Sequence, residues 1–126
     1  MSLLFDSTVL IAHLRGAPEA TELLVEATST SALASVVSRA EIEGGMRSDE
    51  RRDVARLFRG LELVPVSDPI ARRAGVHLRR FRRSHPGVDL ADYLIAATAE
   101  EMGVELATLN VKHFPMFPKL LPPWVC

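Results

Sequence analysis

The chain has 126 residues, of which 48% are hydrophobic and 25% charged, and its formal net charge is −1 at pH 7. This length fits one domain over residues 1–126 with one sizeable core. The composition excludes a disordered or collagen-like chain, and the net charge argues neither for nor against binding to nucleic acid. With no signal-peptide pattern, no apolar run of membrane-spanning length and a single cysteine, Cys126, we expect a soluble cytoplasmic protein without a membrane segment.

Short apolar runs alternate with helical patterns along the whole chain. In chain order we predict a strand at 3–5, a helix ending at 16, a helix from 18, a strand at 31–37, helices at 38–45 and 49–59, a strand at 61–66, helices at 68–83 and 89–102, a strand at 105–108 and a short strand at 120–121. This alternation predicts a parallel α/β sheet with helices on both faces. Sheets of this kind bind ligands beyond the carboxyl ends of their strands.

Polar side chains follow the predicted strands at these ends. Asp6 comes directly after the first strand, and Glu41 lies in the first turn of the helix after the second. Asp92 lies in the first turn of the helix before the fourth strand, and Asn110 follows that strand. Carboxylates that lie close together repel each other, and a divalent cation removes the conflict. Mg²⁺ prefers oxygen ligands and generates hydroxide from water at neutral pH, so such a cluster suits phosphodiester hydrolysis.

Each acid also has a purely structural explanation. Ser38 and Glu41 have the spacing of a capping box, and Asp6 with the two hydroxyl residues after it could cap the first helix. Asp89 has the position of an N-cap, with Asp92 in the first turn, where the helix dipole favours a negative charge. The spacing alone therefore leaves both helix capping and a metal site open.

Four segments carry a more specific signal. They are L-F-D-S-T-V-L-I at 4–11, S-R-A-E-I-E-G-G at 38–45, D-Y-L-I-A-A-T-A at 92–99 and L-A-T-L-N-V-K-H-F at 106–114. Together and in this order they resemble the PIN-domain family, and within it the VapC-type toxins of toxin–antitoxin pairs. The resemblance spans nearly the whole chain. It implies a three-layer α/β/α sandwich around a central, mostly parallel sheet of four to five strands.

The resemblance also implies an activity and a set of site residues. It implies a metal-dependent endoribonuclease toxin that hydrolyses phosphodiester bonds in RNA, either tRNA or rRNA. The positions that match the family's catalytic residues are Asp6, Glu41, Asp92 and Asn110. Asp6 and Asp92 would be the main ligands of Mg²⁺, or of Mn²⁺, with Glu41 and Asp89 as further candidate ligands. Asn110 brings no negative charge, which weakens the case for a second metal ion, and Thr108 would support the site by hydrogen bonding.

Three further expectations concern partners. The resemblance implies a homodimer, a cognate antitoxin that neutralises the toxin, and a toxin–antitoxin hetero-oligomer. A second hypothesis is a catalytically silent PIN-like subunit that holds a DNA-binding antitoxin in an autoregulatory complex. The charge-free Asn110 favours this second hypothesis, whereas the complete set of Asp6, Glu41 and Asp92 argues against it.

A run of six arginines between positions 72 and 83 is the most uneven charge in the chain. On a helix, Arg72, Arg79 and Arg83 lie opposite the apolar stripe. Three interpretations stay open: a solvated face, contact with the phosphates of an RNA substrate, and docking of an acidic partner.

Overall fold

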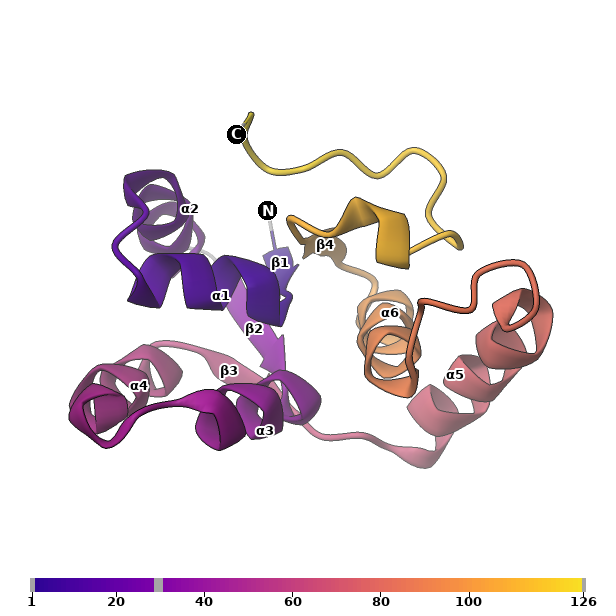
Figure 1. The fold of residues 1–126 in the computed structure, drawn as a ribbon, viewed down its shortest axis with the longest axis horizontal. Coiled ribbons are helices and arrows are strands. Elements are labelled where there is room, and N and C mark those ends of the chain that lie inside the picture. Colours follow the sequence, from indigo (N-terminus) through magenta and orange to yellow (C-terminus); the bar gives the residue numbers. More distant parts are fainter. Residues whose placement is uncertain (1, 29–30, 126) are drawn as a thin grey trace.

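A four-stranded parallel sheet lies between two layers of helices (Figure 1). The computed structural model describes residues 2–28 and 31–125, so Cys126 lies outside the described residues. The elements in chain order are β1 (Ser2–Phe5), α1 (Ser7–Leu14), α2 (Pro18–Thr28), β2 (Ser31–Ser35), α3 (Val36–Gly45), the 3₁₀ turn η1 (Ser48–Glu50), α4 (Arg51–Arg59), β3 (Glu62–Val64), α5 (Asp68–Phe81), α6 (Leu90–Met102), β4 (Glu105–Ala107) and the 3₁₀ turn η2 (Val111–His113). Within the described ranges, no helix is both long enough and apolar enough to cross a bilayer.

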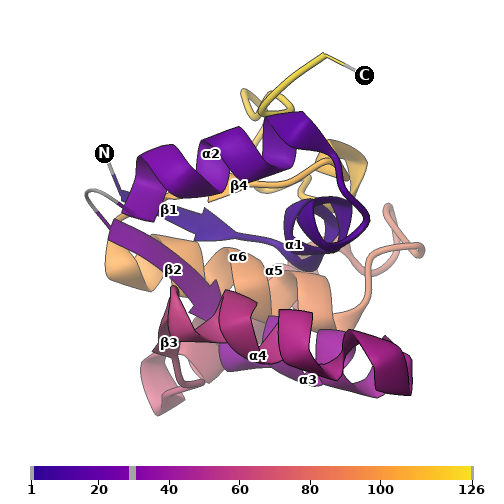
Figure 2. The same ribbon diagram turned by 90° about the vertical axis from the view of Figure 1, so that its left-hand side faces the viewer.

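The strand order is β3-β2-β1-β4, and each neighbouring pair is parallel. The carboxyl ends of the strands therefore share one edge, and Figure 2 shows β1 and β2 pointing the same way, toward α1 and α3. In the register, Phe5 at the end of β1 lies beside Ala107 at the end of β4. The chain order reverses at β1, and open α/β sheets bind ligands in the crevice at such a reversal. The topology therefore predicts a ligand site at the carboxyl ends of β1 and β4.

Alternate residues of each strand pack against opposite layers. Phe5 and Ala34 contribute to the core under α1, α2 and α4, whereas Leu4, Leu33 and Leu106 contribute to the core under α5 and α6. Figure 1 shows these two groups of helices on either side of the sheet. Parallel strands buried on both faces are expected to be apolar throughout, as the short apolar runs of the sequence are. The predicted α/β/α sandwich is confirmed.

Some boundaries differ from those predicted. Helix α3 starts two residues early because Ser35 is the cap, its hydroxyl oxygen accepting the backbone N–H of Val37 at 3.0 Å. Strand β2 therefore ends at Ser35 instead of 37. Helix α4 starts at Arg51, since residues 48–50 form a 3₁₀ turn. Strand β3 ends at Val64, where Pro65 follows without an N–H for the ladder.

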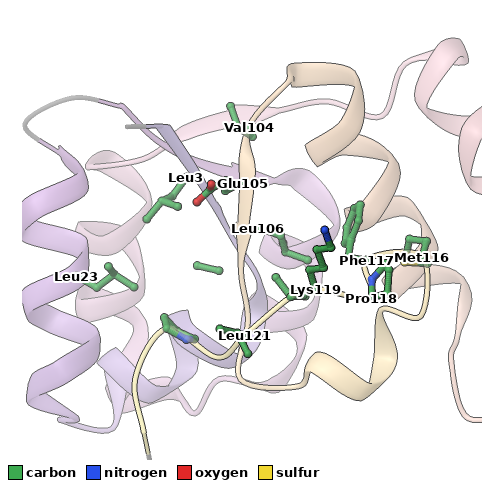
Figure 3. A pocket seen from close by; sticks show the side chains of 13 residues that line it. Leu3, Leu23, Val104, Glu105, Leu106, Met116, Phe117, Pro118, Lys119 and Leu121 are labelled. Atoms are coloured by element: carbon green, nitrogen blue, oxygen red, sulfur yellow. The ribbon is translucent and has the colours of Figure 1, made fainter.

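The predicted strand at 120–121 is wrong, because among the described residues the sheet ends at β4. The C-terminal segment passes beside β4 without pairing, and its prolines at 118, 122 and 123 supply no N–H donors. Between this segment, β4 and α2 lies an apolar cavity of about 680 Å³, shown in Figure 3. Its walls include Leu3, Leu23, Leu106, Phe117 and Leu121, and none of the predicted site residues lines it.

The turn between α6 and β4 depends on the backbone conformation of Gly103, which a substitution can test. Its φ is +66°, a left-handed conformation that costs an L side chain about 1–2 kcal/mol, although a Cβ there would meet no atom within 4 Å. We expect Gly103→Ala to lower the free energy of unfolding by about that amount in urea denaturation. The control is Gly44→Ala, inside α3 with equal space, which should gain about 0.5–1 kcal/mol. Equal effects of the two substitutions would contradict this account.

Candidate functional site

Asp6 lies at the end of β1, in the crevice between β1 and β4. Only 4% of its surface is exposed. Its Oδ2 accepts the Thr108 hydroxyl at 2.7 Å and the Thr8 hydroxyl at 3.0 Å. Its Oδ1 accepts no hydrogen bond from residues 2–28 or 31–125. Asp6 makes no side-chain cap to α1, so the capping alternative is wrong for this residue. The threonines fix the carboxylate and leave one oxygen for a ligand.

The same two threonines join the segments that follow β1 and β4. The backbone N–H of Leu109 donates to Thr8 Oγ1 at 3.0 Å, and that of Asn110 donates to Thr108 Oγ1 at 3.0 Å. Thr108 is fully buried, so its hydroxyl is a costly group to leave unpaired. These bonds link the backbone N–H of Asn110 to the Asp6 carboxylate through the Thr108 hydroxyl, as one hydrogen-bonded group.

Glu41 reaches the same edge from α3. Its Oε1 accepts the Ser7 hydroxyl at 2.6 Å, across 34 positions of sequence. The predicted capping box with Ser38 is wrong, because Ser38 lies inside α3 and its buried hydroxyl has no hydrogen-bond partner in the described part of the chain. Glu41 is thus tied to the residue that follows Asp6 instead of to its own helix.

Asp92 and Asp89 form the predicted pair at the start of α6. The Asp92 N–H donates to Asp89 Oδ1 at 3.1 Å, and the Asp89 N–H donates to Asp92 Oδ2 at 3.2 Å. Asp92 Oδ2 also lies 3.0 Å from Nδ1 of His113, in η2. An ionised carboxylate only accepts hydrogen bonds, so this imidazole nitrogen carries the proton. Asp89 is confirmed as the cap of α6, and His113 links Asp92 to the segment after β4.

The charge on Asp92 is disfavoured in its surroundings. The pKa of its carboxyl group is raised from 3.8 to about 6, mainly by burial and also by the negative charge of the nearby Asp89 carboxylate. The hydrogen bonds from the Asp89 N–H and from His113 act in the opposite direction without overcoming these effects. A nearby cation would stabilise the ionised form, so this carboxylate favours binding of a positive ion.

The predicted site residues lie at one edge of the sheet, but only some of them are in contact. Asp6, Thr108 and Asn110 form one hydrogen-bonded group. Glu41 is bonded to Ser7, the residue after Asp6, and Asp92 to His113, three positions after Asn110. Within 2–28 and 31–125, no three Asp, Glu, His or Cys side chains are close enough to hold a metal ion between them. An all-oxygen set with one or two carboxylates in reach nevertheless fits Mg²⁺, which keeps several of its waters.

The three arginines predicted to contact RNA lie on or just beyond α5, outside this group. All three are exposed. Arg79 and Arg83 lie at the C-terminal end of α5, from which the chain leads to Asp89, whereas Arg72 lies in the first half of the helix.

Ser7, Thr8 and His113 are not among the predicted site residues, although each is hydrogen-bonded to an acid. For His113, its position after the fourth strand allows contact with substrate, but favours a packing or loop role. The signal for Ser7 and Thr8 is their position directly after a strand-end acid, but the same pattern occurs at helix caps. His113 gives no comparable signal, because 21 positions separate it from Asp92.

Comparison with known proteins agrees with this geometry. The PIN domain family matches residues 3–116. Ribonuclease VapC10 of Mycobacterium tuberculosis (strain ATCC 25618 / H37Rv) is 56% identical over 123 residues, which cover 97% of this chain and 92% of that protein. Ribonuclease VapC19 of the same strain is 43% identical over 123 residues, which cover 96% of this chain and 98% of that protein.

A solved structure described as a toxin-antitoxin complex from Klebsiella pneumoniae has the same fold. It superposes with a TM-score of 0.81 at 27% identity and covers 99% of this chain and 100% of that one. The chain therefore belongs to the PIN-domain family and, within it, to the VapC proteins. This confirms the resemblance drawn from the four sequence segments.

Thr108→Val tests the bond that orients Asp6. Valine keeps the shape but removes the hydroxyl, which leaves the Asn110 N–H without its acceptor and Asp6 Oδ2 with one donor fewer. We expect a loss of about 2–3 kcal/mol in the free energy of unfolding, measured in urea. Thr108→Ser keeps the hydroxyl and should lose only about 1 kcal/mol for the missing methyl group. The interpretation is wrong if serine is the more damaging of the two.

Asp92→Asn tests the raised pKa of Asp92 through the pH dependence of stability. The pKa is higher in the folded state, at about 6, than the ordinary 3.8, so the folded protein binds more protons between these values and loses stability as pH rises through about 6. Asparagine abolishes this loss. In EDTA, the stability of the variant relative to the parent should rise by on the order of 2 kcal/mol from pH 4.5 to pH 7.5. A relative stability that stays constant or falls would show that the pKa is not raised.

Proposed function

We propose that this protein is a metal-dependent endoribonuclease that acts as the toxin of a toxin–antitoxin pair. The observation that carries the proposal is the Asp6 carboxylate, which two threonines hold in the β1–β4 crevice with one oxygen unbonded. Asp92 and Glu41 are held at the same edge by donors of their own. The relative at 56% identity is named a ribonuclease, which supports RNA as the substrate.

The metal would be held mainly by Asp6 and Asp92. Each has its Oδ2 engaged by side-chain donors, while its Oδ1 has no hydrogen-bond partner among the described residues. Two carboxylate oxygens together with water suit Mg²⁺, and Mn²⁺ accepts the same ligands. When bound, the ion would polarise a phosphoryl oxygen and lower the pKa of water.

The other residues would position the reacting groups. Glu41, with Oε1 held by Ser7, presents Oε2 to accept a hydrogen bond from the attacking water. The side-chain amide of Asn110 donates to a phosphate oxygen without adding negative charge. Arg72, Arg79 and Arg83 supply positive charge for the RNA backbone, which the acids alone would repel.

The proposal extends to partners. A cytoplasmic enzyme that cuts tRNA or rRNA must be kept inactive in its own cell, and a cognate antitoxin would do so. The solved Klebsiella structure, a toxin-antitoxin complex, supports a partner of this kind. We propose that the toxin is a homodimer and joins the antitoxin in a hetero-oligomer.

A catalytically silent subunit that holds a DNA-binding antitoxin is the second candidate. It is favoured by the charge-free Asn110 and by the finding that no three acidic or histidine side chains enclose an ion in the described ranges. Cleavage of RNA by the isolated protein separates the two candidates.

Asp6→Asn is the direct test of the proposed activity. The purified, antitoxin-free protein should cut RNA in Mg²⁺ and stop cutting in EDTA. Asparagine removes the negative charge of the main ligand, so we expect cleavage to fall at least about 100-fold, read from labelled RNA on denaturing gels. The control is Asp68→Asn, an exposed acid at the start of α5, which should cut like the parent. If the parent cuts no RNA with Mg²⁺ or Mn²⁺, the nuclease assignment fails and the silent subunit is favoured.

A further inference from the structure

We infer that the end of α5 and the turn after it form a binding surface for the phosphates of single-stranded RNA. We call this surface the arginine cluster, and it consists of Arg79, Arg80, Phe81, Arg82, Arg83 and His85. The inference rests on the proposed function, because it names the surface by which the RNA substrate would be held next to the acids.

The charge of the cluster is unopposed. From residue 69 to residue 88 the sequence contains no acid. Its four arginines are exposed, and none of them forms an ion pair in the described part of the chain. Earlier in the same helix, by contrast, Arg73 lies 2.6 Å from Glu101 of α6. Four unpaired guanidinium groups together fit a polyanion, and phosphates are ligands that arginine binds well.

An aromatic ring holds part of this charge in place. The Arg80 guanidinium lies over the Phe81 ring, 5.2 Å from its centre. The His85 ring lies edge-on to the same phenylalanine, with 5.7 Å between the ring centres. The backbone N–H of His85 donates to the backbone carbonyl of Phe81 at 2.8 Å. Phe81 is half-buried and packs on the core under α5 and α6. The positive groups are therefore partly ordered before RNA binds, which lowers the entropic cost of binding.

The cluster lies at the end of α5 from which the chain leads to the acids of α6. Contacts between Arg73 and Glu101 and between His77 and Glu100 show that the middle of α5 packs beside the C-terminal turn of α6. From the end of α5 the chain leads directly back to the start of α6, where Asp89 and Asp92 lie. Asp89, the exposed cap of α6, is only four positions after His85, which limits the distance between their Cα atoms to about 14 Å. An RNA strand that extends from the cluster along this short connection would reach the start of α6, where Asp92 lies.

The recessed position of Asp6 indicates that the RNA that reaches it is single-stranded. Only 4% of Asp6 is exposed, so a phosphate must enter the crevice to reach it. A flexible single strand can bend into such a crevice, and the exposed imidazole of His85 offers a face for stacking of an unpaired base. A stiff duplex held on the cluster could not bring its backbone to the same depth.

RNA binding without cleavage tests the inference. The protein carries Asp6→Asn and the buffer contains EDTA, and the probe is a short fluorescein-labelled single-stranded RNA of mixed sequence, followed by fluorescence anisotropy. Binding is measured from about 50 to about 200 mM salt. Adding Arg79→Ala and Arg83→Ala should raise the Kd roughly tenfold and reduce the slope of log K against log salt by about 1.4, since each phosphate contact contributes about 0.7.

The matched control carries Arg52→Ala and Arg59→Ala on α4, which loses the same charge. Figure 1 shows α4 and α5 at opposite ends of the molecule, and both control arginines are exposed. This control should bind within twofold of the parent. Phe81→Leu keeps every charge but removes the ring, so it should raise the Kd severalfold without changing the salt slope. Circular dichroism and thermal unfolding establish that each variant is folded.

The outcomes separate this inference from the proposed function. If the variant with Arg79→Ala and Arg83→Ala binds RNA like the control, the inference is wrong even when the parent cuts RNA. If that variant loses RNA binding but the parent with Asp6 intact cuts no RNA, the RNA-binding surface is confirmed and the nuclease proposal fails.

A further experiment uses polyglutamate as the probe. Binding of polyglutamate that depends on the cluster, together with RNA binding that does not, would assign the cluster to an acidic protein and overturn the inference.

Discussion

The hydrogen bond from Thr108 to Asp6 is the contact on which the site depends. It joins the ends of β1 and β4, two strands that are neighbours in the sheet although 102 positions separate these residues in the chain. A buried carboxylate needs donors, and here the donors are hydroxyl groups of the segments that follow both strands, Thr8 after β1 and Thr108 after β4. The bond fixes one oxygen of the carboxylate and leaves the other available, which is the arrangement that a metal ligand requires. It also explains why the chemistry is located where the order of the strands reverses.

The other two acids follow the same rule. Glu41 is held by Ser7, and Asp92 is held by His113, so each acid is positioned by a residue that follows the end of β1 or β4. Hydroxyl and imidazole donors thus hold the acids at one edge, each acid by a hydrogen bond of its own. The pKa of Asp92 is nevertheless raised, mainly by burial and also by the Asp89 carboxylate, so its charge remains disfavoured. A divalent ion would remove the remaining penalty, and membership of the PIN-domain family is consistent with that chemistry.

The sequence predicts most of the fold because each apolar run is short and fully buried, and because caps such as Asp89 act locally. It also identifies the acids, since strand ends in a parallel sheet converge. The sequence could not resolve which partner each acid has: Glu41 fits a capping box by spacing, yet its partner Ser7 is brought near only by the tertiary fold. The strand expected at 120–121 fails for a similar reason. Apolar residues are present there, but prolines deny the segment the N–H donors of a strand.

Calorimetric titration of the antitoxin-free protein with Mn²⁺ is the most direct test of the central claim, that the oriented Asp6 carboxylate forms a metal site with Asp92. We expect a saturable binding event in the parent that is lost in Asp6→Asn and weakened in Thr108→Val, where the carboxylate keeps only the hydrogen bond from Thr8. Binding of equal strength in all three proteins would contradict it, because the ion would then be held elsewhere.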